Sequence, residues 1–110
     1  MTGSADDRDE AQEPTVVLRV QGALDISTVA DLHHEIDAAA STRPARILVD
    51  LAEVDAGDAN GVRALMGAAR EASVRLSDLV IAVKARSALD RLFWRTGARE
   101  FLHVVPSNDR

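Results

Sequence analysis

The sequence predicts a single α/β domain built on a mostly parallel sheet, and two observations carry this prediction. Segments with the apolar pattern of strands alternate along the chain with segments of helical periodicity, in the order βαβαβαβ. The chain has 110 residues, which is enough for one compact core and too few for two. Because this alternation gives parallel strands joined by right-handed helical crossovers, we expect four to five strands with the helices packed against the sheet.

Four segments have the pattern of strands. In residues 15–20, Val16, Leu18 and Val20 alternate with the other three positions, as in a strand with one buried face. Gly22 then marks a turn. Residues 79–83 are continuously apolar, as expected of a central strand covered on both faces. The four predicted strands are residues 15–20, 46–51, 79–83 and 101–105, the last ended by Pro106.

Three segments have helical periodicity. The first begins at Thr28, and the second runs from Gly61 to residue 76 after a connection at residues 52–60. The third ends at Gly97, where a left-handed residue is favoured. The predicted capping pairs are Thr28 with Asp31 and Ser87 with Asp90. The predicted inward residues are Val29, Leu32, Ile36, Ala39 and Ala40, then Val62, Leu65, Met66, Ala69, Ala72 and Leu76, and then Leu89, Leu92 and Phe93.

The acidic charge of the chain is concentrated at its N-terminus. The net charge is −5, and residues 1–14 hold five carboxylates against one arginine, which leaves −1 for residues 15–110. A polar, charged segment cannot bury enough apolar area to offset its ordering entropy. We therefore predict a flexible acidic tail at 1–14, a domain at 15–106 and a short C-terminal tail at 107–110. The domain has no basic stripe for a phosphate backbone, so nucleic-acid binding is not expected.

Several classes of chemistry lack the residues that they need. The chain has no cysteine, which excludes disulfides and thiolate metal sites and fits a cytoplasmic protein. No apolar run approaches the roughly 18 residues that a membrane span needs. His33 and His34 have no second histidine or cysteine at ligand spacing, and there is no Gly-rich phosphate loop or nucleophile elbow. We expect no metal, no cofactor, no enzymatic activity and no direct membrane insertion.

The strand-to-helix junction at residues 58–61 is the most informative polar segment. Free backbone N–H groups at a helix start favour negative charge, so Asp58 or Asn60 is expected either to cap the helix or to contact a partner. A phosphoryl-accepting domain, with Asp50 or Asp58 as acceptor and Lys84 nearby, is the least favoured hypothesis. Magnesium needs several convergent oxygen ligands, and Asp25 is the one carboxylate just after the first strand. Thr28 and Ser73 are alternative acceptors in that hypothesis.

Three segments, in order and at matching distances, resemble the signature of the STAS domain family. They are Gly22-Ala-Leu-Asp25, the stretch from Val49 to Val62, and Arg91-Leu-Phe-Trp-Arg-Thr-Gly97. The resemblance covers about residues 15–105. It implies a STAS-like fold and a non-enzymatic module that binds an anti-sigma factor or related ATP-binding regulator, whose kinase activity modifies a serine in the family's Asp-Ser-Ser-Gly loop.

The sequence departs from this family pattern at the phospho-acceptor position. Asp58 and Gly61 are kept, but Ala59 and Asn60 stand where the family has hydroxyl residues, and an asparagine cannot accept phosphate. Ala56 and Gly57 are also smaller than the apolar pair common in the family. The phosphorylation switch is therefore not expected at Asn60, although the fold is.

The resemblance implies a partner-binding site and leaves two functions open. One is an anti-sigma factor antagonist, and the other is the STAS accessory subunit of a phospholipid-trafficking transporter ATPase; homodimer formation is also left open. A separate group, Trp94 among four arginines, is either an interface or a solvated charged face. The residues assigned to the partner-binding site are Asp25, Asp55, Asp58, Ala59, Asn60, Gly61 and Arg63, and the four arginines are Arg86, Arg91, Arg95 and Arg99.

Overall fold

A computed structural model of the chain describes residues 14–74 and 78–107. Strands and helices alternate as predicted, so the α/β fold class and the βαβαβαβ order are confirmed. The elements in chain order are β1 (Thr15–Leu24), α2 (Ile26–Ala40), β2 (Arg46–Gly57), α3 (Ala59–Ala72), β3 (Leu79–Val83), α4 (Ala88–Thr96), the 3₁₀ turn η1 (Ala98–Glu100) and β4 (His103–Pro106).

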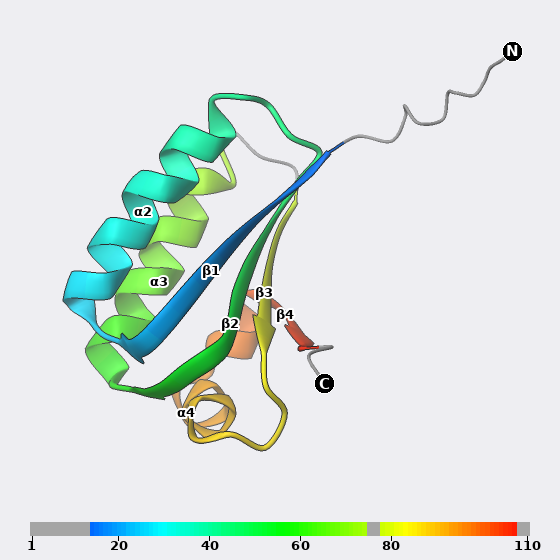
Figure 1. Cartoon of the computed structure of the whole chain (residues 1–110). Helices are drawn as coiled ribbons and strands as arrows, with labels where there is room; N and C mark the ends of the chain where they lie inside the picture. Colours follow the sequence, from blue (N-terminus) through cyan, green and yellow to red (C-terminus); the bar gives the residue numbers. More distant parts are fainter. Residues whose placement is uncertain (1–13, 75–77, 108–110) are drawn as a thin grey trace, which may run out of the picture.

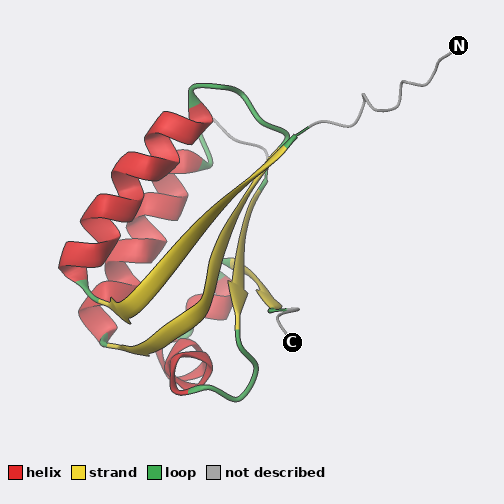
Figure 2. Ribbon diagram, viewed as in Figure 1, coloured by secondary structure: helices red, strands yellow, loops and turns green. Residues whose placement is uncertain are grey.

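The four strands form one sheet in the order β1-β2-β3-β4, and each neighbouring pair is parallel. Parallel neighbours that follow one another in the chain need crossovers of the same hand, which bring successive helices to the same face. Figure 1 and Figure 2 accordingly show α2 and α3 side by side on one face of the sheet, with α4 at the end where β2 finishes. The opposite face of the sheet carries no described helix.

The hydrophobic core lies between the sheet and this helical layer. Phe93 of α4 is fully buried, together with Ile36 of α2 and Leu65 of α3. On β2 the buried residues alternate, as the period of a strand requires. Each such large side chain contributes roughly 1.5–3 kcal/mol by its burial. The inward-facing strand residues are Ile47, Val49 and Leu51 of β2 and Ile81 and Val83 of β3.

Two strands are longer than predicted. β1 continues to Leu24 rather than residue 20, and β2 continues to Gly57 rather than residue 51. The prediction was wrong because register shifts at Arg19/Gln21 and Gly22/Ala23 interrupt the alternation. Gly22 lies inside β1 with φ of +89° instead of in a turn. Residues 52–57, predicted as a connection, pair with the end of β1 down to Leu24 opposite Gly57.

The boundaries of α3 and β4 also differ from the prediction. α3 begins at Ala59 and ends at Ala72, not at 61 and 76, and Leu76 lies outside the described residues. β4 begins at His103, which leaves Phe101 before the strand and 67% exposed. By contrast, the Ser87 cap of α4 and the left-handed Gly97, with φ of +74°, are confirmed.

Little of the two predicted tails falls within the described residues. Of the predicted tails, only Pro14 and Ser107 are described, so the boundaries at 1–14 and 107–110 stay predictions. The carbonyl of Pro14 accepts a hydrogen bond from the N–H of Ala45 at 3.2 Å, which fixes where the N-terminal segment meets the sheet. Within residues 14–74 and 78–107, no helix is long and apolar enough to cross a membrane.

Candidate functional site

Two of the three signature segments, Gly22–Asp25 and Val49–Val62, meet where β1 and β2 end and α2 and α3 begin. Leu24 and Gly57 are paired in the register, and each strand is followed after a single residue by a helix. The two helix N-termini therefore lie at the same edge of the sheet (Figure 1). A helix start exposes unpaired N–H groups, so this edge carries two sets of them, and the sequence must supply acceptors for both.

Asp25 supplies the acceptor for α2. Its carboxylate accepts a hydrogen bond from the N–H of Thr28 at 2.9 Å, and the hydroxyl of Thr28 accepts one from the N–H of Asp25 at 2.9 Å. This reciprocal pair is a capping box. The predicted pairing of Thr28 with Asp31 was wrong, because the helix begins two residues before Thr28, which places Thr28 at its third position. The Thr28 hydroxyl also donates to the carbonyl of Ala23, at 2.8 Å.

Asp58 supplies the acceptor for α3. Its Oδ1 accepts a hydrogen bond from the N–H of Gly61 at 2.7 Å, and its own N–H donates to the carbonyl of the fully buried Leu24 at 3.2 Å. The expected capping role is therefore observed for Asp58, and a cap of this kind contributes about 1 kcal/mol. The bond to Leu24 also ties the start of α3 to the end of β1.

Gly61 is required by the close approach of α3 to the β1–α2 junction. A Cβ atom at this position would lie 2.3 Å from the carbonyl oxygen of Leu24 and 2.8 Å from Cα of Asp25. Both are backbone atoms, so no side-chain rotation could relieve the overlap. The glycine thus allows Asp25, Asp58 and the first turn of α3 to form one compact surface.

Asn60 does not cap the helix but lies exposed on the first turn of α3. Its Oδ1 accepts a hydrogen bond from Nη2 of Arg63 at 2.8 Å, one turn further along the helix. Ala59 beside it is half-buried. The amide of Asn60 and the guanidinium of Arg63 are therefore oriented together toward solvent, where they can meet another protein.

Asp55 is placed differently from the other predicted site residues. It is exposed near the end of β2, not in a loop, and among the described residues no hydrogen bond or ion pair joins it to Asn60 or Arg63. Sequence reasoning also missed Ile26, which is 61% exposed directly after the Asp25 cap. Its spacing of three residues from Val29 predicts a buried position, but Ile26 is the first residue of α2 and its side chain lies outside the core.

Three cavities among the described residues lie away from Asn60 and Asp58. The described part of the chain has cavities of about 390, 440 and 170 Å³, and none of these three is lined by Asn60 or Asp58. In the same residues, no three histidine or carboxylate side chains converge to hold a metal ion. Asp50, an acceptor in the phosphoryl hypothesis, pairs with Arg19 of the neighbouring edge strand β1 at 3.5 Å. The Ser73 hydroxyl donates to the carbonyl of Arg70 at 2.7 Å.

Comparisons with known proteins identify the family. A family model described as "Mlab, STAS domain" matches residues 8–105. The chain belongs to the STAS domain family. No curated protein sequence matches this STAS domain, and the family evidence comes from the family model together with the fold.

Two solved structures share this fold. The crystal structure of an anti-sigma factor antagonist from Mycobacterium paratuberculosis superimposes with a TM-score of 0.70 at 20% identity, covering 86% of this chain and 80% of the other. The anti-sigma factor antagonist SpoIIAA, in its unphosphorylated form, superimposes with a TM-score of 0.61 at 20% identity, covering 86% and 83%. At this level of identity the likeness establishes the STAS fold, and the predicted recognition of the family is confirmed.

Proposed function

We propose that this STAS domain is an anti-sigma factor antagonist that binds an anti-sigma factor, or a related ATP-binding regulator, through the first turn of α3. Two structures with the same fold are named as antagonists of this kind. The proposed contact surface consists of Asn60 and Arg63 of α3, Ile26 of α2 and the exposed Asp55 of β2. In this proposal the domain acts by binding in the cytoplasm and catalyses no reaction.

The observation that carries the proposal is the placement of Asn60. This residue is exposed at the start of a helix, at the position where the family pattern has its phospho-acceptor, and its amide is already held by Arg63. Because asparagine carries no hydroxyl, the surface stays uncharged at this point and cannot be switched by a kinase. Phosphorylation of residue 60 therefore cannot switch partner binding on or off, and any control acts on another part of the protein.

The test is to add a charge at this position without disturbing the fold. Asn60→Asp should keep the contact with Arg63, and a carboxylate in the first turn of a helix is favourable by about 0.3–1 kcal/mol. We expect the melting temperature to stay the same or rise slightly. Binding to the anti-sigma factor, measured by calorimetric titration, should weaken by about ten-fold or more, because a new charge at an interface must be desolvated or repelled.

Two control variants separate charge from shape. Asn60→Ala removes the hydrogen bond to Arg63 but adds no charge, so it should weaken binding less than Asn60→Asp. Glu35→Gln alters an exposed carboxylate in the middle of α2 and should leave the affinity unchanged. Undiminished affinity of Asn60→Asp for the anti-sigma factor would show that the first turn of α3 is not the binding surface.

A second candidate function is a STAS accessory subunit of a transporter ATPase. It is favoured by the absence of a hydroxyl at residue 60, because a structural subunit needs no phosphorylation cycle there. Affinity purification of the tagged chain from its own cell separates the two candidates by the class of ATP-binding protein recovered. Recovery of a transporter ATPase whose binding depends on Asn60, with no anti-sigma factor, would support this second function and contradict the first.

A further inference from the structure

The charges of this chain are separated into an acidic segment and a basic one. Residues 1–13 hold five carboxylates and one arginine, for a net charge of −4, whereas residues 84–99 hold five cations and one carboxylate, for a net charge of +4. The whole chain has a net charge of −5, so α4 and its flanks form a basic region on an otherwise acidic protein. We define the exposed Arg91, Trp94 and Arg95 together with the half-buried Arg99 as the basic surface.

The buried carboxylate of Asp90 fixes the position of one arginine of the basic surface, Arg99. This carboxylate is buried, with 8% of its area exposed, and accepts a hydrogen bond from Nη2 of Arg99 at 2.6 Å. Burial alone would raise the pKa of Asp90, but the hydrogen bonds from Arg99 and from the backbone of Arg86 outweigh it and lower this pKa below its usual value. Asp90 is therefore ionised in the folded protein and holds the guanidinium of Arg99 in place.

The held guanidinium in turn positions the aromatic ring of the surface. Cζ of Arg99 lies 4.7 Å from the centroid of the Trp94 ring, a cation–π distance. Trp94 is 66% exposed although its neighbour Phe93 is fully buried. A large exposed tryptophan with a fixed arginine is the composition of interface hot spots, and its prior ordering lowers the entropic cost of binding.

One further feature of the basic surface is unfavourable unless something covers it. Arg91 and Arg95 are one turn apart on α4, and like charges at this spacing destabilise a helix by about 0.2–0.5 kcal/mol. Among the residues that the structure describes, Arg95 has no ion-pair partner. An acidic occupant would offset this repulsion.

The length of the acidic segment decides how far it can extend from the start of β1. Val17, Leu48, Val80 and His103 form one row across the sheet, so the start of β4 is level with the start of β1. Three strand spacings separate them, which is about 14 Å. Asp6 lies nine residues before Thr15, and nine extended residues span up to about 30 Å. Asp6 and Asp7, nine and eight residues before Thr15, are therefore the carboxylates with the length to reach η1, which leads directly into β4.

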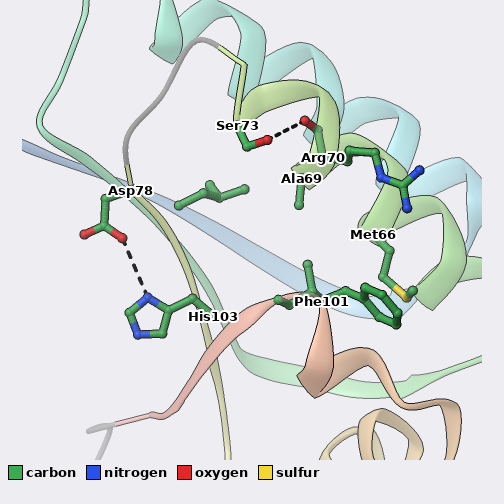
Figure 3. Close-up of a pocket in the computed structure, with 9 residues that line it drawn as sticks. Met66, Ala69, Arg70, Ser73, Asp78, Phe101 and His103 are labelled. Atoms are coloured by element: carbon green, nitrogen blue, oxygen red, sulfur yellow. Dashed lines mark hydrogen bonds and ion pairs between the residues drawn. The ribbon is translucent and has the colours of Figure 1, made fainter.

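A groove of about 390 Å³ lies along this route, between α3 and the η1–β4 segment. Figure 3 shows Arg70 of α3 on one side of it and the exposed Phe101, two residues after Arg99, on the other. Asp78 at the mouth of the groove is bound by Arg46 at 2.7 Å and lies 3.6 Å from His103. The groove thus offers the guanidinium of Arg70 to a chain that passes from the sheet edge toward the basic surface.

We propose that the acidic segment, residues 1–13, passes along this groove and docks on the basic surface of its own chain. Its Asp6 and Asp7 carboxylates pair with Arg95 and Arg99, and the chain covers the ring of Trp94. The contact is intramolecular, because a short linker gives the segment an effective concentration in the millimolar range. The inference does not depend on the proposed function, since the basic surface and Asn60 lie on different helices.

The test uses Trp94, the single tryptophan of the chain, as its own reporter. Its emission maximum and its quenching by acrylamide are measured in the full chain and in a full-length variant whose segment is neutralised. In low salt the neutralised variant should show a red-shifted emission and about two-fold stronger quenching, because a docked chain excludes water from the ring. In salt at about 1 M, where the Debye length is about 3 Å, the wild-type chain should show the same red-shifted emission and stronger quenching as the neutralised variant. The neutralising substitutions are Asp6→Asn, Asp7→Asn, Asp9→Asn and Glu10→Gln.

Matched variants of the body complete the design. Arg95→Glu should behave like the neutralised segment, whereas Arg43→Glu, an exposed arginine in the α2–β2 connection, should behave like the wild type. The difference between wild type and neutralised segment should persist on roughly hundred-fold dilution. Identical quenching of the two chains in low salt would overturn the proposal, as would an Arg43→Glu effect equal to that of Arg95→Glu. A difference that disappears on dilution would show that the segment binds a second copy, which also contradicts intramolecular docking.

Discussion

The close approach of α3 to the β1–α2 junction predicts that Gly61→Ala is strongly destabilising. The added Cβ would lie 2.3 Å from the carbonyl oxygen of Leu24, about 1 Å inside ordinary contact, and 2.7 Å from the carbonyl carbon. The helix must then move away from β1, which also strains the 3.2 Å bond from Asp58 to Leu24. Overpacking of this kind costs about 1–3 kcal/mol, and alanine recovers less than about 1 kcal/mol through its helix propensity.

The net expectation is a loss of about 2 kcal/mol in the free energy of unfolding. For a domain of this size that lowers the melting temperature by about 5–15 °C. Urea unfolding followed by circular dichroism gives the free energy directly, provided that the slope of the transition is unchanged. The variant should also weaken partner binding, because the displacement of α3 moves Asn60 relative to Ile26.

Gly67→Ala is the matched control within the same helix. No atom lies within 4 Å of the Cβ that would be added at Gly67, so the variant should gain about 0.5–1 kcal/mol from reduced backbone entropy in the unfolded chain. The two substitutions are chemically identical and are predicted to have opposite signs. A Gly61→Ala protein as stable as Gly67→Ala would refute the argument that the glycine is required by the contact with Leu24.

Three further predictions concern stability. Asp90→Asn should lower the free energy of unfolding by about 1–3 kcal/mol, since a charged hydrogen bond to Arg99 is lost. Because the folded-state pKa of Asp90 is lowered, its contribution is present above the unfolded pKa and is lost as pH falls through the folded value; urea titrations from pH 6 to 2 should therefore show a shallower acid decline in the variant. Phe93→Ala should cost about 3–5 kcal/mol by cavity formation, measured by urea unfolding. Asp58→Ala should cost about 0.5–2 kcal/mol through the lost cap to Gly61, whereas a change below 0.3 kcal/mol would contradict that role.

The order of the elements and the parallel sheet could be predicted because the determinants are local. The alternation in residues 15–20 and the continuous apolar run at 79–83 both correspond to strands of the sheet. Ser87 and Gly97 bound α4 as their capping preferences predict. The ends of β1 and β2 could not be predicted, because they are fixed by pairing between segments about 32 residues apart, as in the hydrogen bond of Gln21 to Glu53.

The candidate site could be predicted in part, for a similar reason. Asp58 and Gly61 were identified from sequence, and the structure gives each a definite task in the junction. The role of Asp25 as the cap of α2 was not identified, because the apolar periodicity begins only at Val29 and does not reveal where the first turn starts. The exposure of Ile26 depends on how the first turn of α2 packs on the sheet, which is a tertiary property.

The two proposed binding surfaces differ in which charged groups are left to contact a binding partner, so different substitutions should affect each surface. At the edge formed by α2 and α3, Asp25 and Asp58 are committed to capping, so the side chain that remains to meet a partner is the neutral Asn60. On α4, a buried carboxylate instead fixes the cation of Arg99 at an exposed ring, and Arg95 is left without a described partner. The first surface is therefore sensitive to an added negative charge and the second to a removed positive one. Asn60→Asp should change partner binding without changing the emission of Trp94, and Arg95→Glu should change that emission without changing the geometry at Asn60.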